Sequence, residues 1–167
     1  MGRIIIRTLD EPINAIKMDF EKMEITALIP QRAPFLMVDR ILSCDDTDAV
    51  TTFTVREDNI LLEADQLASS GIVEHMAQSC AARMGCVAIL HNEPIRLGYI
   101  GEVKNLKLYR LPKVGEQLTT EVHILSVIMD MTLASVMTKV NGEVIAETRM
   151  KLAMTHIEAA DTKPINN

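Results

Sequence analysis

Apolar and polar residues alternate along several segments of the chain, and this alternation predicts β-strands. Residues 49–55 form one such run, rich in β-branched side chains. Residues 118–128 form a longer one, in which Glu121 and His123 share the polar face and the opposite face carries Leu118, Thr120, Val122, Ile124 and Ile128. A third region, 132–154, is divided by Asn141-Gly142, a dipeptide typical of tight hairpin turns. These patterns favour an antiparallel sheet with one buried and one solvated face.

Residues 71–90 break the alternation and predict a helix. Apolar and small residues recur there at helical spacing and cover most of the circumference, at Val73, Met76, Ala77, Cys80, Ala81, Met84 and Val87. Such a helix is enclosed by the fold and does not lie on its surface. Gly85 permits another backbone to approach closely. Because strands outnumber helices, we expect an α+β domain in which an antiparallel sheet wraps around one central helix.

The length of 167 residues suits a single domain. Residues 1–17 form an N-terminal extension, residues 18–156 the domain, and residues 157–167, where periodicity is lost, a loose C-terminal tail. The apolar run near the N-terminus is too short for a signal peptide or a membrane span.

Charge and cysteine content exclude several classes of protein. The formal net charge of −6 argues against non-specific nucleic-acid binding, which requires a basic surface. The three cysteines form no CxxC pair and no metal-ligand spacing with histidine, so we expect three small buried side chains and neither a metal nor a cofactor. Three cysteines without a disulfide framework fit the reducing cytoplasm.

Two segments contain candidate chemistry. Residues 28–40 predict a loop with two prolines that enters a strand near Phe35. Residues 71–78 place Glu74 in the first turn of the enclosed helix, where the helix dipole stabilises a carboxylate. The alternative is a functional one: Glu74 beside an apolar cavity transfers protons, free N–H groups near Gly71 hold a substrate carbonyl, and Gln78, one turn on, orients Glu74.

Together the two segments resemble the β-hydroxyacyl-acyl-carrier-protein dehydratases of fatty-acid synthesis, which have the hotdog fold. That family's signature, Leu-Pro-His-Arg-x-Pro-Phe-Leu-x-Val-Asp-Arg, is matched by Pro30, Arg32, Pro34, Phe35, Leu36, Val38, Asp39 and Arg40. Its helix start, Gly-x-x-x-Glu-x-x-Ala-Gln, is matched at Glu74, Ala77 and Gln78, with Gly71 at or near the glycine. The resemblance extends from about Glu24 to Met154.

The resemblance implies a lyase that eliminates water from an acyl thioester carried by acyl-carrier protein or CoA, without a cofactor. It implies a homodimer, or a higher assembly such as a trimer of dimers, in which each site combines the loop of one subunit with the helix carboxylate of the other. The catalytic positions are then Glu74 and Gln31, and Gly71, Gln78, Phe35 and Ala33 line the substrate site.

The chain departs from the family at several positions. Gln31 occupies the place of the catalytic histidine, and a carboxamide does not titrate near neutrality. Loss of a general base slows a reaction by about 10²–10⁴-fold. His75 does not replace it, because neighbouring helix residues point about 100° apart, so we expect His75 to pack or to face solvent. Ala33 replaces a frequent tyrosine gate, and residues 56–70 lack the usual Gly and Pro. These differences indicate a divergent subfamily, such as those of secondary-metabolite or aryl-polyene pathways.

Three functions therefore remain open. The chain is a dehydratase or hydratase in which Gln31 orients the thioester or a water, a hotdog thioesterase in which Glu74 activates water or attacks directly, or a non-catalytic subunit. The last binds acyl-carrier protein or supplies Glu74 to a paralogue that has the histidine. A basic cluster, Lys104, Lys107, Arg110 and Lys113, either docks the acidic carrier protein or is an ordinary solvated surface.

Overall fold

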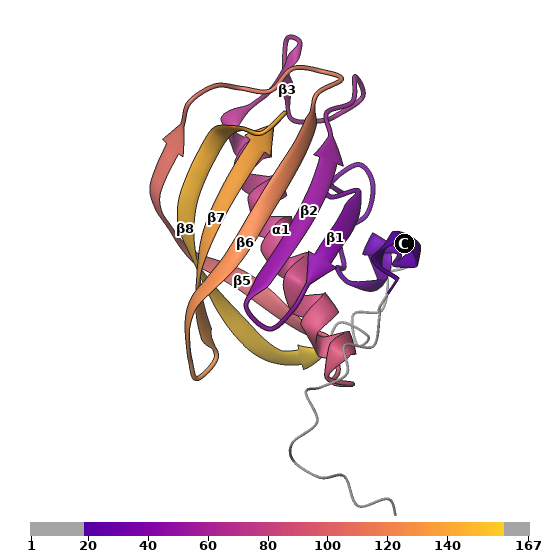
Figure 1. Cartoon of the computed structure of the whole chain (residues 1–167), viewed down its shortest axis with the longest axis vertical. Helices are drawn as coiled ribbons and strands as arrows, with labels where there is room; N and C mark the ends of the chain where they lie inside the picture. Colours follow the sequence, from indigo (N-terminus) through magenta and orange to yellow (C-terminus); the bar gives the residue numbers. More distant parts are fainter. Residues whose placement is uncertain (1–18, 159–167) are drawn as a thin grey trace, which may run out of the picture.

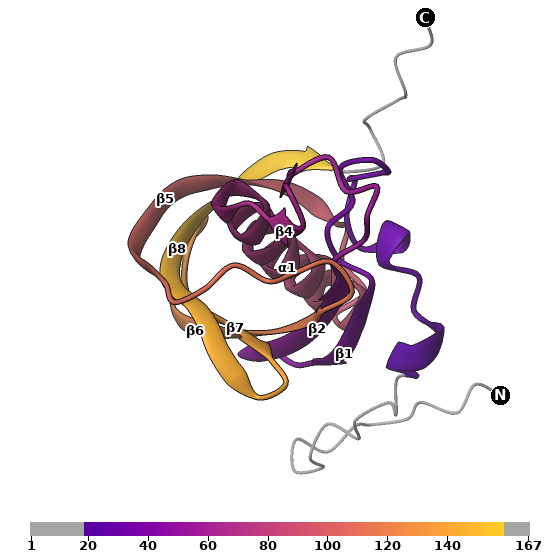
Figure 2. The ribbon, with the colours of Figure 1, turned by 90° about the horizontal axis from the view of Figure 1, so that it is seen from above.

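A curved antiparallel sheet surrounds one long α-helix in the computed structural model, which describes residues 19–158 (Figures 1 and 2). The sheet order is β1-β2-β6-β7-β8-β5. Its strands are β1 (Arg40–Cys44), β2 (Asp48–Thr54), β5 (Arg96–Leu108), β6 (Gln117–Ile128), β7 (Met131–Val140) and β8 (Glu143–Glu158). The helix α1 (Ser69–Leu90) passes through the middle, and the short 3-10 helices η1 (Phe20–Lys22) and η2 (Ile25–Ala27) precede the sheet. The expected α+β architecture is confirmed.

Strands β6, β7 and β8 form the centre of the sheet. The turn between β7 and β8 consists of Asn141 and Gly142, both with positive φ (50° and 82°), which is the backbone that a two-residue hairpin requires. Along β7 the side chains alternate strictly between buried and partly exposed from Thr132 to Val140. The hairpin and its one-sided burial agree with the sequence pattern.

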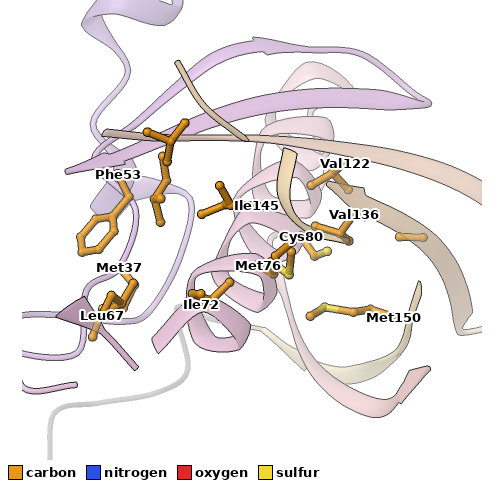
Figure 3. Close-up of a cluster of buried hydrophobic side chains, with 14 of the residues drawn as sticks. Met37, Phe53, Leu67, Ile72, Met76, Cys80, Val122, Val136, Ile145 and Met150 are labelled. Atoms are coloured by element: carbon orange, nitrogen blue, oxygen red, sulfur yellow. The ribbon is translucent and has the colours of Figure 1, made fainter. Parts of the chain in front are cut away.

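The main core lies between α1 and the inner face of the sheet (Figure 3). Ile72, Met76 and Cys80 of the helix contribute to it, together with strand residues such as Val136 and Met150, which are fully buried. Burial of this apolar area is the dominant stabilising contribution to such a fold. The helix is enclosed, as its composition predicts. No helix within residues 19–158 is long and apolar enough to cross a membrane.

A second apolar cluster joins η2, β1 and the later half of α1. It contains Leu28, Ile29, Ile41 and Cys86, and Cys44 packs against it. Gly85 allows this contact, because a Cβ added there would overlap the carbonyl oxygen of Leu28. The close backbone approach expected at Gly85 therefore brings the segment before Gln31 onto the helix.

Several expected boundaries are wrong. The strand predicted to begin near Phe35 begins at Arg40, since the two prolines and the turn at residues 33–35 keep the chain out of the ladder. Ile128 is 68% exposed and does not share the face of Leu118, because a register shift between Ile124 and Ser126 inserts an extra residue and reverses the alternation.

The other boundaries concern the ends of the domain and the segment before α1. Strand β8 continues through Ile157 and Glu158, two residues assigned to the tail. The extension 1–17 and the rest of the tail lie outside the described residues. The segment 56–70, whose sequence lacks Gly and Pro, contains a small hairpin of β3 (Leu62–Glu63) and β4 (Gln66–Leu67) directly before α1.

Candidate active site

Glu74 lies in the first turns of α1 and is partly buried. Its carboxylate accepts a hydrogen bond of 2.8 Å from Nε2 of Gln78, one helical turn later. This is the orientation of Glu74 by Gln78 that their spacing predicts. The carboxylate is thus held at one oxygen and is not free in bulk solvent.

Gln78 also holds the loop that contains the first motif. Its Nε2 donates to the carbonyl of Phe35 (2.6 Å), and its Oε1 accepts from the backbone N–H of Met37 (2.7 Å). Gln78 is 1% exposed, so these bonds are made in the interior, where an unmet polar group costs about 1–3 kcal/mol. One amide side chain therefore positions both Glu74 and residues 35–37.

His75, three residues before Gln78 on α1, binds the same loop. Its ring is fully buried and bonds the carbonyl of Met37 through Nδ1 (2.6 Å) and the hydroxyl of Thr120 through Nε2 (2.7 Å). A carbonyl only accepts, so Nδ1 carries the proton and Thr120 donates to Nε2. Burial lowers the pKa of His75 to about 4, so the ring is neutral at pH 7. His75 is therefore a packing residue pointing away from Glu74, as the helix geometry predicts.

Gln31 precedes this part of the loop and is partly buried. The neighbouring Arg32 fixes the backbone by donating to the carbonyls of Thr26, Ile29 and Gln31. The Oε1 atom of Gln31 is buried without a hydrogen-bond donor within residues 19–158, and no bond in that range links Gln31 to Glu74. Within residues 19–158, a single copy of the chain therefore does not join Gln31 to Glu74 by a hydrogen bond.

The remaining expected site residues lie in the loop, at Ala33 and Phe35, and at the start of α1, at Gly71. Ala33 is exposed and Phe35 is 57% exposed, an unusual degree for a large aromatic side chain. Gly71 is buried against Leu67 and leaves no space for a Cβ. The first N–H of α1 with a backbone acceptor belongs to Ile72, so the N–H of Gly71 is free of described partners and available to an oxygen ligand.

Asp39 has a structural role that the sequence pattern did not indicate. Its carboxylate accepts from the backbone N–H of Thr54 (2.8 Å) and pairs with Arg56 (2.9 Å). The residue therefore connects the end of the loop to β2. A carboxylate directly before a strand was the available signal.

The basic cluster is mostly neutralised by neighbouring carboxylates. Lys104 pairs with Glu102, Lys107 with Glu147, and Arg110 with Glu116 and Glu143. A polar hollow of about 280 Å³ lies beside Lys107 on the outer face of the sheet, between β5, β7 and β8, and none of the expected site residues lines it. Over residues 19–158, no group of three or more metal-ligating side chains comes together.

Comparison with known proteins identifies the family. The model of the ApeP-like family, described as ApeP dehydratase, matches residues 23–162. The chain belongs to the ApeP-like dehydratase family. This ApeP-like chain is also 31% identical over 138 residues to the 3-hydroxyacyl-[acyl-carrier-protein] dehydratase FabZ of Ruminiclostridium cellulolyticum, covering 79% of this chain and 95% of the relative. FabZ of Geobacillus thermodenitrificans is 31% identical as well, over 78% of this chain and 92% of its own length.

Solved structures confirm the hotdog fold of this ApeP-like chain. The dehydratase heterocomplex ApeI:P from Xenorhabdus doucetiae aligns with a TM-score of 0.75 at 17% identity, over 80% of this chain and 92% of that one. A hypothetical thioesterase with coenzyme A from Streptococcus pneumoniae aligns with a TM-score of 0.57 at 12% identity, over 69% and 84%. The resemblance to β-hydroxyacyl dehydratases inferred from the two motifs is therefore confirmed at the level of family and fold.

Proposed function

We propose that the chain binds β-hydroxyacyl thioesters and contributes Glu74 as the acid/base group of a dehydratase site. The observation that carries the proposal is the geometry of Glu74, a carboxylate at the start of an enclosed helix, held by Gln78, one turn from the free N–H of Gly71. The relatives named as 3-hydroxyacyl-[acyl-carrier-protein] dehydratases support this substrate class and acyl-carrier protein as the carrier.

Dehydration removes a proton from Cα and a hydroxyl group from Cβ of the substrate, which leaves an enoyl thioester and water. In our scheme the Glu74 carboxylate accepts the α-proton and returns it to the departing hydroxyl group, so the carboxylate ends in its starting state. The N–H of Gly71 donates to the thioester carbonyl, where negative charge develops. Gln31 presents its amide N–H₂ to the same carbonyl or to the leaving water.

A site with Gln31 alone works without an imidazole base, and we expect it to be about 10²–10⁴-fold slower than one with histidine. A second arrangement follows from the side chain at position 31, because a carboxamide does not titrate near neutrality. In it, Glu74 of this chain forms an active site with the histidine of a paralogue, and the other site of the dimer, which contains Gln31, is inactive. The Xenorhabdus doucetiae structure is a dehydratase heterocomplex, and this supports such a pairing.

Either arrangement requires two subunits, and we propose that they join through β5. This edge strand is 13 residues long and leaves large apolar side chains exposed, namely Tyr99, Ile100, Val103, Leu106 and Leu108. The opposite edge, β1, has five residues, carries a register shift, and has η1 against it. An open edge of this length pairs readily with another strand, whereas short and irregular edges resist pairing.

The experiment compares the wild type with Glu74→Gln and Gln31→His on β-hydroxyacyl and enoyl thioesters of acyl-carrier protein and CoA, with products identified by mass spectrometry. We expect loss of activity in Glu74→Gln and a gain of about 10²-fold or more in Gln31→His. The matched control is Glu121→Gln, which removes an exposed carboxylate from the outer face of β6.

Each outcome selects one function. Formation of enoyl or hydroxyacyl thioester supports the dehydratase, and free acid with thiol assigns the chain to the thioesterases instead. Activity that appears only with a histidine-bearing paralogue, and still depends on Glu74, supports the subunit arrangement. Unchanged turnover in Glu74→Gln would remove the basis of the proposal.

A further inference from the structure

Two of the three cysteines meet where β1 lies on the helix. Cys44 is the last residue of β1 and is only partly buried, which corrects the expectation that all three cysteines are buried, and its Sγ is 3.8 Å from the carbonyl oxygen of Arg83 on α1. Cys86 follows Arg83 by three residues, is fully buried, and belongs to the apolar cluster against which Cys44 packs. Cys44 therefore lies against the helix within one turn of Cys86, and both side chains pack in the same apolar cluster.

A buried guanidinium accompanies the pair. Arg83 is 7% exposed, and one of its terminal nitrogens donates to the carbonyl of Asp46 in the turn after β1. Its Nε has no hydrogen-bond partner in the part of the chain that the structure describes. A buried donor of this kind is costly unless an acceptor is supplied, and a thiolate is such an acceptor.

The hydrogen bond from Cys44 lowers the pKa of Cys86, and the charge of Arg83 lowers it further, although burial opposes both effects. Cys80 has a different environment. It lies in the main core, and burial raises its pKa to about 12. The hydrogen bond to Cys86, together with burial, raises the pKa of Cys44, so Cys86 is the more acidic thiol of the pair.

We propose that Cys44 and Cys86 form a redox-active dithiol that closes to a disulfide and ties β1 to α1. The thiol of Cys86 loses its proton, and its thiolate, stabilised by the hydrogen bond from Cys44 and by the charge of Arg83, attacks one oxygen of a peroxide. The O–O bond breaks, and the departing hydroxide takes up a proton, which yields Cys86 sulfenic acid and water. The thiol of Cys44 then attacks the sulfenic sulfur, the S–S bond forms, and hydroxide leaves with the Cys44 proton as a second water. In total, two thiols and one peroxide give one disulfide and two waters.

The dithiol lies close to the segment that precedes Gln31, so its oxidation affects the candidate site. Gly85, adjacent to Cys86, is in contact with Leu28, three residues before Gln31, and Leu28 shares the apolar cluster of Cys86. Closing the disulfide shifts Cys44 and Cys86 toward each other within this cluster. Oxidation therefore acts on the segment that positions Gln31. In a reducing cytoplasm, disulfides of this type are transient and sense oxidants.

The test uses the full-length protein and hydrogen peroxide as the oxidant. After oxidation, free thiols are alkylated in denaturant and tryptic peptides are mapped by mass spectrometry. Cleavage at Arg and Lys places the three cysteines on separate peptides, residues 41–56, 57–83 and 84–96. We expect a mass loss of about 2 Da, a cross-link between 41–56 and 84–96, and its reversal by dithiothreitol.

The variants make the outcome specific. Cys80→Ala is the matched control and retains the cross-link, whereas Cys44→Ser abolishes it. A cross-link to peptide 57–83, oxidation of a single cysteine to sulfinic acid, or three unmodified thiols overturns the proposal. Peptide mapping of the wild-type protein decides the question even where a variant does not fold. The result is independent of the dehydratase assignment, because thiols and not turnover are measured.

Discussion

At residue 31 the chain buries a carboxamide oxygen for which residues 19–158 provide no hydrogen-bond donor. An unmet buried polar atom costs about 1–3 kcal/mol, so Gln31→Met, which keeps the shape and removes the polar group, should raise the free energy of unfolding by about 1 kcal/mol. Urea denaturation of dilute protein measures the change. An unchanged midpoint would show that water or a second subunit already satisfies the oxygen. A gain in stability together with loss of turnover is the signature of a polar group retained for function.

The buried ring of His75 predicts a specific pH dependence. Its pKa is about 4 in the folded chain against 6.5 when exposed, so between these values only the unfolded state binds the proton. Stability contributed by the neutral ring is complete above pH 6.5 and is lost as the pH falls toward 4, in total about 3 kcal/mol. Carboxylates such as Asp45 and Glu116, whose pKa values hydrogen bonds lower, also contribute to acid denaturation.

Comparison with His75→Asn isolates the contribution of the ring. The wild type should lose about 3 kcal/mol more than the variant between pH 7 and pH 4, measured by urea denaturation at each pH. The difference in slope is the readout, because the variant also loses hydrogen bonds to Met37 and Thr120 at every pH. Parallel curves for the two proteins would contradict the assigned neutral ring.

Some contacts of these residues could be predicted from the sequence, and others could not. The pairing of Glu74 with Gln78 follows from helical spacing, and so does the direction of His75. The bonds of Gln78 to Phe35 and Met37 span more than 40 positions in sequence. Neither periodicity nor local propensity contains that information, because such contacts depend on how the loop is folded against the helix. The role of Asp39 was missed for the same reason.

At the scale of elements, the contact between α1 and η2 depends on Gly85. Alanine there gains about 1 kcal/mol in helix propensity, but its Cβ would overlap the Leu28 carbonyl, and relieving such overpacking costs about 1–3 kcal/mol or more. We expect Gly85→Ala to lower the free energy of unfolding by about 2 kcal/mol and to loosen the segment before Gln31. Thermal denaturation and hydrogen exchange of residues 25–31 measure the two effects.

Gly101→Ala is the control for an added methyl group, because the nearest atom to its Cβ lies at an ordinary contact distance of 3.6 Å. Equal destabilisation of both variants would argue against a special role of the η2 contact.

The helix and the hairpin of this fold were predictable because each repeats a period over many residues. The register shift that exposes Ile128 was not, since one inserted residue leaves the local alternation unchanged and is set by pairing with β7.

At the scale of the whole molecule, the difference between the two sheet edges predicts which edge joins two copies of the chain. If two copies join through β5, Ile100→Asp places a charge inside the interface, and Leu42→Asp places the same charge on the bulged edge β1, where solvent already covers the side chain. Ile100 and Leu42 are 40% and 50% exposed in one copy, so neither substitution disturbs the core. We expect light scattering to show a halved mass for Ile100→Asp and an unchanged mass for Leu42→Asp. The converse result would place the interface at β1.

The dimer also makes turnover depend on protein concentration, because the proposed site combines a loop and a carboxylate from different subunits. We expect acyl-thioester turnover of Ile100→Asp to fall with the dimer fraction and to recover as protein concentration rises. A site contained within one subunit would not show this dependence.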